Sequence, residues 1–194
     1  IENSALSLNI FTLQNGLTVF VIPDKSNALV SVELVNRAGF SAQNQSTCGF
    51  FSMLARLHEF QMKDYLELHN GKWQCNSDST KISLLISAEE LEDCLEILSD
   101  QLSGAVFSDK EIKTVHDQMK KESTEYSQST SGFINSSIDS RVFHEQPWKH
   151  DSGIYPSLFS NFSTGEVRTI LNVIKKNFYT PENCSLFISG NLSK

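Results

Sequence analysis

The sequence has no apolar run close to the roughly 18–20 residues that a membrane-spanning helix needs. It also has few basic residues, 16 Lys and Arg against 23 Asp and Glu, which gives a net charge of −7. This balance argues against a surface for nucleic acid or anionic lipid. We therefore expect a soluble protein with no membrane span and no nucleic-acid partner.

Cysteine is scarce and widely spaced. Cys48, Cys75, Cys94 and Cys184 form no Cys-x-x-Cys pair, which excludes the usual zinc-knuckle and thioredoxin-like spacings. We expect buried free thiols rather than a disulfide. The first residues, Ile-Glu-Asn-Ser, resemble neither a signal peptide nor a natural start, so we expect a piece of a longer chain. The cellular compartment stays open.

Alternation of apolar and polar residues predicts six strands. Asn15-Gly16, between the first two, is a strong signal for a hairpin turn. In the third, Val30, Val32 and Leu34 share one face, so we expect that face to be buried in an antiparallel sheet. The expected strands are residues 9–13, 17–22, 29–36, 73–77, 81–87 and 184–189.

Helical periodicity and capping signals predict six helices. Asn70-Gly71 is expected to end the second of them as a left-handed cap. The polar residues 128–132 favour a loop, and in the helix after it Ile134, Ile138 and Val142 are expected to face inward. The expected helices are residues 49–60, 62–69, 87–102, 107–126, 133–143 and 163–178, with a long surface excursion over 146–163.

The order of these elements, mixed rather than strictly alternating, predicts the fold class. We expect an α+β domain in which a largely antiparallel sheet of about six strands is covered by helices. A chain of 194 residues with 39% hydrophobic residues, among them 13 Phe, can bury one core. Residues 1–194 are therefore expected to form a single domain.

The stretch from Gly49 to Phe60 follows a strand that ends in Asn36-Arg37-Ala38-Gly39, and Glu122 comes later, on a long predicted helix. With Asn15-Gly16-Leu17-Thr18-Val19 ahead of it, this order resembles the N-terminal domain of the pitrilysin/insulinase family of zinc metallopeptidases, inverted zincins that include mitochondrial processing peptidase-like proteins. The resemblance covers essentially the whole chain. It implies one half of a clamshell, closed with a second homologous domain or subunit around an extended peptide.

The catalytic helix of that family carries His-x-x-Glu-His, in which the two His bind one Zn²⁺ and the Glu is the general base. The matching positions here are Ser52, Ala55 and Arg56, and none supplies those groups. No shift of register restores the motif, because the nearest histidines, His58 and His69, are eleven residues apart. We expect no catalytic residue, metal or cofactor in this chain.

The resemblance also implies two distal glutamates seven residues apart, of which the second binds zinc. The matching positions are Val115 and Glu122, so one acidic group remains. Glu122 is equally consistent with a solvated helix carboxylate. The sharper hypothesis is that Arg56, 66 residues earlier, forms an ion pair with Glu122 and places its guanidinium where the metal would have been.

The other candidate residues are weaker evidence for a functional site. His58, Glu59 and His69 are expected on a solvated helix surface rather than at a metal ion. Ser52 has no evident base for a hydrolase mechanism. Further titratable residues lack a nucleophile or a ligand set at a defined spacing: His116 with Asp117, and His144 with Glu145 and His150. One acidic group is expected to form a solvated helix face: Glu89, Glu90, Glu92, Asp93 and Glu96.

The sequence therefore predicts a non-catalytic pitrilysin-like domain. It would act as the partner half of a peptidase chamber, as a peptide-binding or scaffolding module, or as a purely structural subunit. The rival hypothesis is an active zinc-dependent metallopeptidase whose ligands are completed from outside this chain. A peptide can bind by adding a strand to an exposed sheet edge even without catalysis. Which strand presents that edge cannot be read from the sequence.

Overall fold

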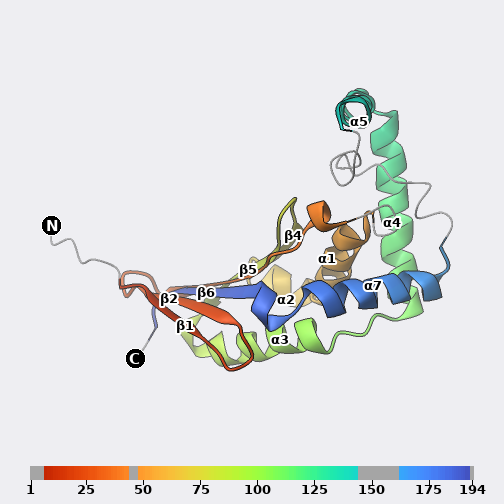
Figure 1. Cartoon of the computed structure of the whole chain (residues 1–194). Helices are drawn as coiled ribbons and strands as arrows, with labels where there is room; N and C mark the ends of the chain where they lie inside the picture. The colour runs from red at the N-terminus through yellow and green to blue at the C-terminus, as the bar shows by residue number, and fades with distance from the viewer. Residues whose placement is uncertain (1–6, 44–47, 144–161, 193–194) are drawn as a thin grey trace.

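A single sheet of six strands carries helices on one of its faces in the computed structural model, which describes residues 7–43, 48–143 and 162–192 (Figure 1). The strand order is β1-β2-β6-β3-β5-β4, and among the described strands only β2 and β6 pair in parallel. The strands are β1 (Asn9–Thr12), β2 (Thr18–Pro23), β3 (Leu29–Asn36), β4 (Lys72–Cys75), β5 (Thr80–Ser87) and β6 (Cys184–Gly190). The predicted α+β class is confirmed.

The helices lie between the strands in sequence, mostly where the periodicity predicted them. Asn70, with a φ of 47°, ends α2 in the left-handed conformation, and the Gly71 N–H closes the turn on the Leu66 carbonyl at 2.6 Å. The α-helices are α1 (Phe50–Gln61), α2 (Lys63–Leu68), α3 (Leu91–Ser103), α4 (Asp109–Gln128), α5 (Thr130–Val142) and α7 (Thr164–Phe178). No described helix is both long and apolar enough to cross a membrane.

Two apolar clusters hold these elements together. One joins the inner face of the sheet to α2 and α3 and contains Val32, Ile82 and Leu98. The other joins α1, α4 and α7 around Phe51 and Leu54, both fully buried. Full burial of a side chain such as that of Phe51 or Leu54 stabilises the fold by about 1.5–3 kcal/mol. The first cluster therefore fixes α3 under the sheet, and the second fixes α1 against α4.

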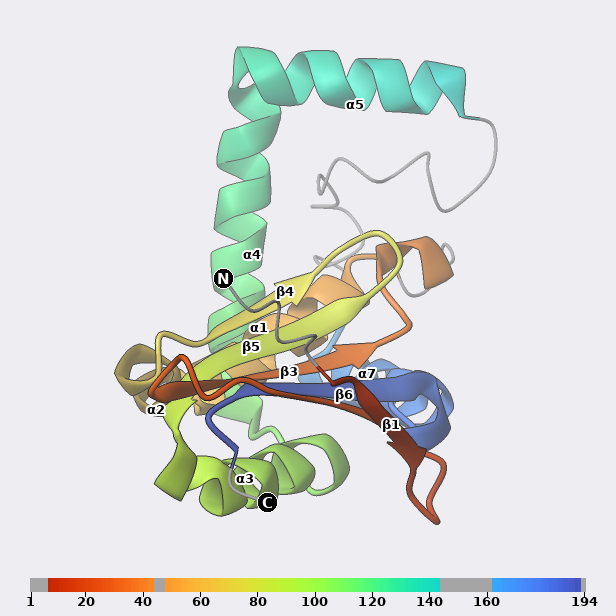
Figure 2. The ribbon, with the colours of Figure 1, turned by 90° about the vertical axis from the view of Figure 1, so that its left-hand side faces the viewer.

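The opposite face of the sheet carries no helix among the described residues (Figures 1 and 2). Phe20 and Phe187 stack there with ring centroids 4.6 Å apart, and Lys81 Nζ lies 3.0 Å from Glu33 Oε1. Large apolar side chains on this face remain well exposed: Leu29 at 45%, Leu85 at 41% and Phe187 at 39%. The alternation in the strands thus separates a buried face from an open one.

Helices α4 and α5 form an arm that stands off from the sheet (Figure 2). The loop predicted at 128–132 is wrong: α4 runs to Gln128 and α5 begins at Thr130, so only Ser129 separates them. Ser129 Oγ accepts the Gly132 N–H at 3.0 Å, and the Ser129 N–H donates to the Tyr126 carbonyl. Polar residues that resembled a loop in the sequence cap two helices instead.

The predicted inward face of α5 is also wrong. Ile134, Ile138 and Val142 are 48%, 52% and 61% exposed, because among the described elements α5 has its main packing contacts with α4. Periodicity shows that side chains share a face, whereas burial depends on a neighbour that the sequence does not reveal.

Several smaller predictions are settled by the same structure. Gly16 adopts a φ of 90° in the hairpin between β1 and β2, as expected for Asn-Gly. All four cysteines are free thiols; three are buried and Cys75 is partly buried. The excursion expected at 146–163 lies almost wholly outside the described residues, as do His144, Glu145 and His150.

Candidate functional site

Helix α1 carries the three motif positions, and the residues before and within it fix its place. Gly49 precedes the helix with a φ of 82°, a conformation that favours glycine, and its N–H donates to Gln43 Oε1 at 2.8 Å. Five large apolar residues of the helix are fully buried: Phe50, Phe51, Met53, Leu54 and Leu57. This packing leaves Ala55 4% exposed, Ser52 partly buried and the Arg56 side chain 40% exposed.

The structure brings Arg56 and Glu122 together across α1 and α4. Arg56 Nη1 donates to Glu122 Oε2 at 2.5 Å, and Gln118 Nε2 donates to Glu122 Oε1 at 2.9 Å. The ion pair that the sequence suggested is therefore present, as a single hydrogen bond rather than a bidentate one. Both carboxylate oxygens of Glu122 are occupied by side-chain donors.

The surroundings of Glu122 favour its charged form. Burial alone raises the pKa of this carboxyl, but the hydrogen bonds from Arg56 and Gln118 and the charge of Arg56 outweigh it, so the pKa lies below its ordinary value. Glu122 is thus ionised at neutral pH and its charge is balanced by Arg56. The Glu122 side chain is 43% exposed, so solvent weakens the pair.

Zinc is the metal that the resemblance implied, and the residues present do not fit it. Zn²⁺ takes His nitrogen, Cys sulfur or carboxylate oxygen, whereas Ser52, Ala55 and Arg56 present a hydroxyl, a methyl group and a cationic guanidinium. Across residues 7–43, 48–143 and 162–192, no group of three or more His, Cys, Asp or Glu could hold a metal ion. Val115, which the resemblance matched to the supporting glutamate, is buried in the α1/α4/α7 cluster.

Ser52 contacts the thiol of Cys75, for which the sequence predicted only a buried thiol. Burial raises the pKa of Cys75, while hydrogen bonds with Thr80 and Ser52 act against that shift. The thiol is therefore protonated at neutral pH and is a poor nucleophile. The pair of Ser52 and Cys75 offers neither a base nor an activated nucleophile.

The solvated position expected for His58 and His69 is wrong. His58 is fully buried, stacked on Trp73 of β4 with ring centroids 4.9 Å apart and placed edge-on to Phe107 at 5.2 Å. Its Nδ1 lies 3.2 Å from Gln101 Oε1, and burial lowers its pKa to about 4. His69 is 7% exposed and packs on Tyr65. His58 is therefore a neutral core residue that joins α1 to β4 and α3.

The remaining candidates do not converge on this site. Glu59 is exposed at the end of α1, and His116 lies 3.6 Å from Asp117 on α4. The acidic residues of α3 and the turn before it are largely exposed, as expected. Glu90 is the exception, because its carboxylate accepts from the Ser87 N–H at 3.0 Å and the Ser87 hydroxyl at 2.7 Å in a capping box.

An open groove of about 620 Å³ lies beside Arg56, between α1, α2 and α4. Next to it β4 lies against α1 and pairs only with β5, so its other edge has no strand partner among the described residues. The structure thus identifies β4 as the sheet edge beside the motif helix. The groove is lined by Arg56, Glu59, Phe60, Lys63, Leu66, Glu67, Asn70, Gly71, Val115 and Gln118.

The sequence did not single out Gln118 and Gln43. The Gln118 amide donates to Glu122, and the Gln43 amide oxygen accepts the Gly49 N–H at the start of α1. Gln118 is one helical turn before Glu122, a spacing that suggests an interaction on one helix face. No sequence signal identified Gln43, because its contact depends on how the chain enters α1.

Comparison with known proteins supports the resemblance. The family model described as "Insulinase (Peptidase family M16)" matches residues 50–151. No curated protein matches the sequence. Among solved structures, a protease from Helicobacter pylori superposes with a TM-score of 0.84 at 15% identity, covering 97% of this chain and 47% of that chain. A putative M16-like peptidase from Alicyclobacillus acidocaldarius gives a TM-score of 0.81 at 16% identity, with coverage of 97% and 47%.

The periplasmic protease PqqL from Escherichia coli gives a TM-score of 0.79 at 13% identity and covers 96% of this chain but 22% of its own. At sequence identities this low, the similarity to these structures shows the fold alone. The chain spans about half or less of the length of these solved structures.

Proposed function

Since the chain belongs to the insulinase family (peptidase family M16), we propose that it is a non-catalytic half of a peptidase-like chamber, which joins a second homologous domain or subunit and binds an extended peptide. The observation that carries this proposal is the contact of Arg56 with Glu122 at 2.5 Å. In the family motif these positions belong to two ligands of one metal ion.

The charges at the site support a metal-free role. A guanidinium keeps its proton at any physiological pH and has no lone pair to give to a cation. Arg56 therefore supplies the positive charge that Glu122 needs, and Gln118 satisfies the second carboxylate oxygen. The site is electrostatically complete without zinc.

The unpaired edge of β4 supports the binding of an extended peptide. An edge strand offers unpaired backbone N–H and C=O groups to an added strand. Trp73 holds β4 against α1 through its stacking on His58, so the edge is rigidly placed beside the groove at Arg56. A peptide added to this edge would lie next to the motif helix without meeting a catalyst.

The open face of the sheet supports the second half of the chamber. Leu29, Leu85 and Phe187 expose apolar surface there, and large exposed apolar patches commonly mark interaction sites. The solved M16-like proteases are at least about twice as long as this chain. A second homologous domain packed on this face would bury it.

Zinc analysis of the purified protein, after chelation and zinc re-addition, tests the proposal together with a peptide-cleavage assay. We expect no stoichiometric zinc and no cleavage. The variant that combines Ser52→His, Ala55→Glu, Arg56→His and Val115→Glu restores the family pattern and is expected to gain about one zinc per chain. Its matched control, with Ser52→Asn, Ala55→Gln, Arg56→Asn and Val115→Gln, changes the size of the side chains without offering strong ligands.

One zinc per wild-type chain, with cleavage that disappears on chelation, would refute the proposal. The rival hypothesis of a zinc site completed from outside this chain is tested in the longer protein or the assembled complex. There the rival predicts that Glu122→Gln abolishes cleavage, whereas our proposal predicts that any cleavage by the other half survives this change.

A further inference from the structure

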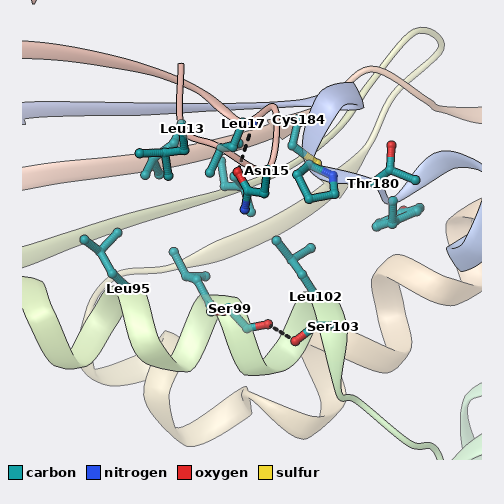
Figure 3. A pocket seen from close by; sticks show the side chains of 14 residues that line it. Leu13, Asn15, Leu17, Leu95, Ser99, Leu102, Ser103, Thr180 and Cys184 are labelled. Carbon is teal, nitrogen blue, oxygen red and sulfur yellow. Dashed lines mark hydrogen bonds between the residues drawn. The ribbon is translucent and has the colours of Figure 1, made fainter. Parts of the chain in front are cut away.

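A pocket of about 360 Å³ lies between the β1–β2 hairpin, the start of β6 and the C-terminal half of α3 (Figure 3). Leu13 and Leu17 of the hairpin face Leu95 and Leu102 of α3 across this space. The volume is at the lower end of the range of about 300–1,000 Å³ that is typical of small-molecule sites. The pocket shares no residue with the groove beside Arg56.

The lining of this pocket is apolar and uncharged. Among the described residues that line it, seven are leucines and none is Asp, Glu, Lys, Arg or His. Its two ionisable residues, Tyr179 and Cys184, are buried, and burial raises the pKa of each, so both are neutral at pH 7. At the rim, Asn15 Oδ1 accepts the Leu17 N–H at 3.1 Å. The occupant that fits the interior is one or two apolar side chains.

A shallow groove along α3 continues from the pocket, because Leu95 and Ser99 line both. This groove is flanked by Glu89, Glu92 and Glu96, none of which has an ion-pair partner among the described residues. Glu92, Glu96 and Ser99 share one helix face, since they are spaced by four and three residues. No Lys or Arg lies between Lys81 and Lys110 in the sequence, so no neighbour along the chain balances these charges.

We propose that the pocket and the groove together bind a peptide segment of a partner protein in which an apolar side chain lies beside lysine or arginine. The apolar side chain fills the leucine-lined pocket. The basic side chains lie along Glu92 and Glu96, about one to two helical turns away, which is about 5–10 Å. Charge complementarity selects this occupant over an acidic or uncharged segment. This site goes beyond the proposed function and does not depend on it.

Fluorescence anisotropy with short labelled peptides tests the proposal on the wild-type protein. The probe contains two leucines flanked by lysines, and two matched peptides replace either the leucines with serines or the lysines with glutamates. The probe is expected to bind about tenfold to hundredfold more tightly than the serine peptide, as follows from burying one or two apolar side chains. Its binding is expected to weaken with added salt, because the acidic residues are exposed.

Variants locate the site. Ser99→Trp places a large ring in the pocket mouth from an exposed helix position, and Leu102→Gln makes the wall polar. Each is expected to weaken binding about tenfold or more. Glu92→Gln with Glu96→Gln is expected to weaken it roughly threefold to tenfold. Asp117→Asn with Glu125→Gln on α4 changes the net charge equally and is expected to leave binding unchanged.

Equal binding of the leucine and serine peptides would overturn the proposal, as would unchanged binding by Ser99→Trp or Leu102→Gln with a wild-type circular dichroism spectrum. If neither pocket variant folds, the comparison of the leucine and serine peptides on the wild-type protein still tests the proposal. Equal loss of affinity in the α3 and α4 charge variants would also overturn it, because the attraction would then be non-specific. Since none of these assays involves zinc or cleavage, failure here is distinguishable from failure of the proposed function.

Discussion

Replacement of His58 by Phe tests the account of how α1 is held in place. The imidazole is fully buried between Trp73 and Phe107, and only Gln101 offers it a hydrogen bond among the described residues. Burial lowers the pKa of His58 from 6.5 to about 4; the Gln101 contact opposes this shift and the charge of Lys175 adds to it. Phe keeps the ring packing but cannot take up a proton.

The sign of the pH effect follows from the lowered pKa. Between pH 6.5 and about 4 the unfolded chain binds a proton at His58 that the folded chain excludes, so stability falls as the pH falls. One proton costs about 1.4 kcal/mol per pH unit, which gives roughly 3 kcal/mol over this window. Below about pH 4 both states are protonated and this contribution stops changing.

Urea denaturation at several pH values from 7 to about 4 measures this effect in the wild type and in His58→Phe. The difference in free energy of unfolding between the two proteins is expected to shift by about 3 kcal/mol in favour of the variant as the pH falls. Carboxyl groups with lowered pKa, such as Glu122, also lose stabilisation in acid, but they do so in both proteins and cancel. A difference that stays constant with pH would refute the buried, neutral state of His58.

Three further predictions concern single contacts. A double-mutant cycle of Arg56→Ala and Glu122→Gln is expected to give a coupling energy of about 0.5–1 kcal/mol at pH 7, because the pair is partly exposed. The coupling is expected to be lost as the pH falls through the lowered pKa of Glu122, because the protonated carboxyl carries no charge, and zero coupling at low salt would contradict the contact. Ser108→Ala removes the hydroxyl that accepts the Glu111 N–H at the start of α4 and is expected to cost about 1 kcal/mol in urea denaturation; no loss would show that the cap is not formed. Gly190→Ala places a Cβ 2.2 Å from the Leu29 carbonyl oxygen at a φ of 132°, so a loss of about 1–3 kcal/mol is expected, and an unchanged midpoint would contradict this backbone geometry.

Much of the fold could be predicted from local sequence because its signals are local. Asn15-Gly16 encodes a hairpin turn by its conformational preference. Ser87 with Glu90 encodes a helix start through a capping box, in which the Glu90 carboxylate accepts the Ser87 N–H and the Ser87 hydroxyl accepts the Glu90 N–H. Each signal needs only neighbours a few residues away. The strand order did not follow from such signals, because β6 pairs with β2 and β3 across most of the chain.

The same distinction between local and long-range signals applies to the candidate site. The chemical types at Ser52, Ala55 and Arg56 were evident from the sequence, and the prediction that the zinc-binding motif is degenerate depends on them. The hydrogen bond of Gln118 to Glu122 joins residues one turn apart on α4, whereas the contact of Cys75 with Ser52 depends on how α1 and β4 pack. A contact between residues far apart in sequence leaves no local signal.

The sequence by itself determined which side chains are present and which local turns, caps and alternations they favour, because those depend on covalent structure and on nearest neighbours along the chain. Only the tertiary structure decided that His58 is buried, that Ile138 on α5 is exposed and that Arg56 meets Glu122. The physical reason is that burial and charge pairing depend on the distances between elements, and packing sets those distances.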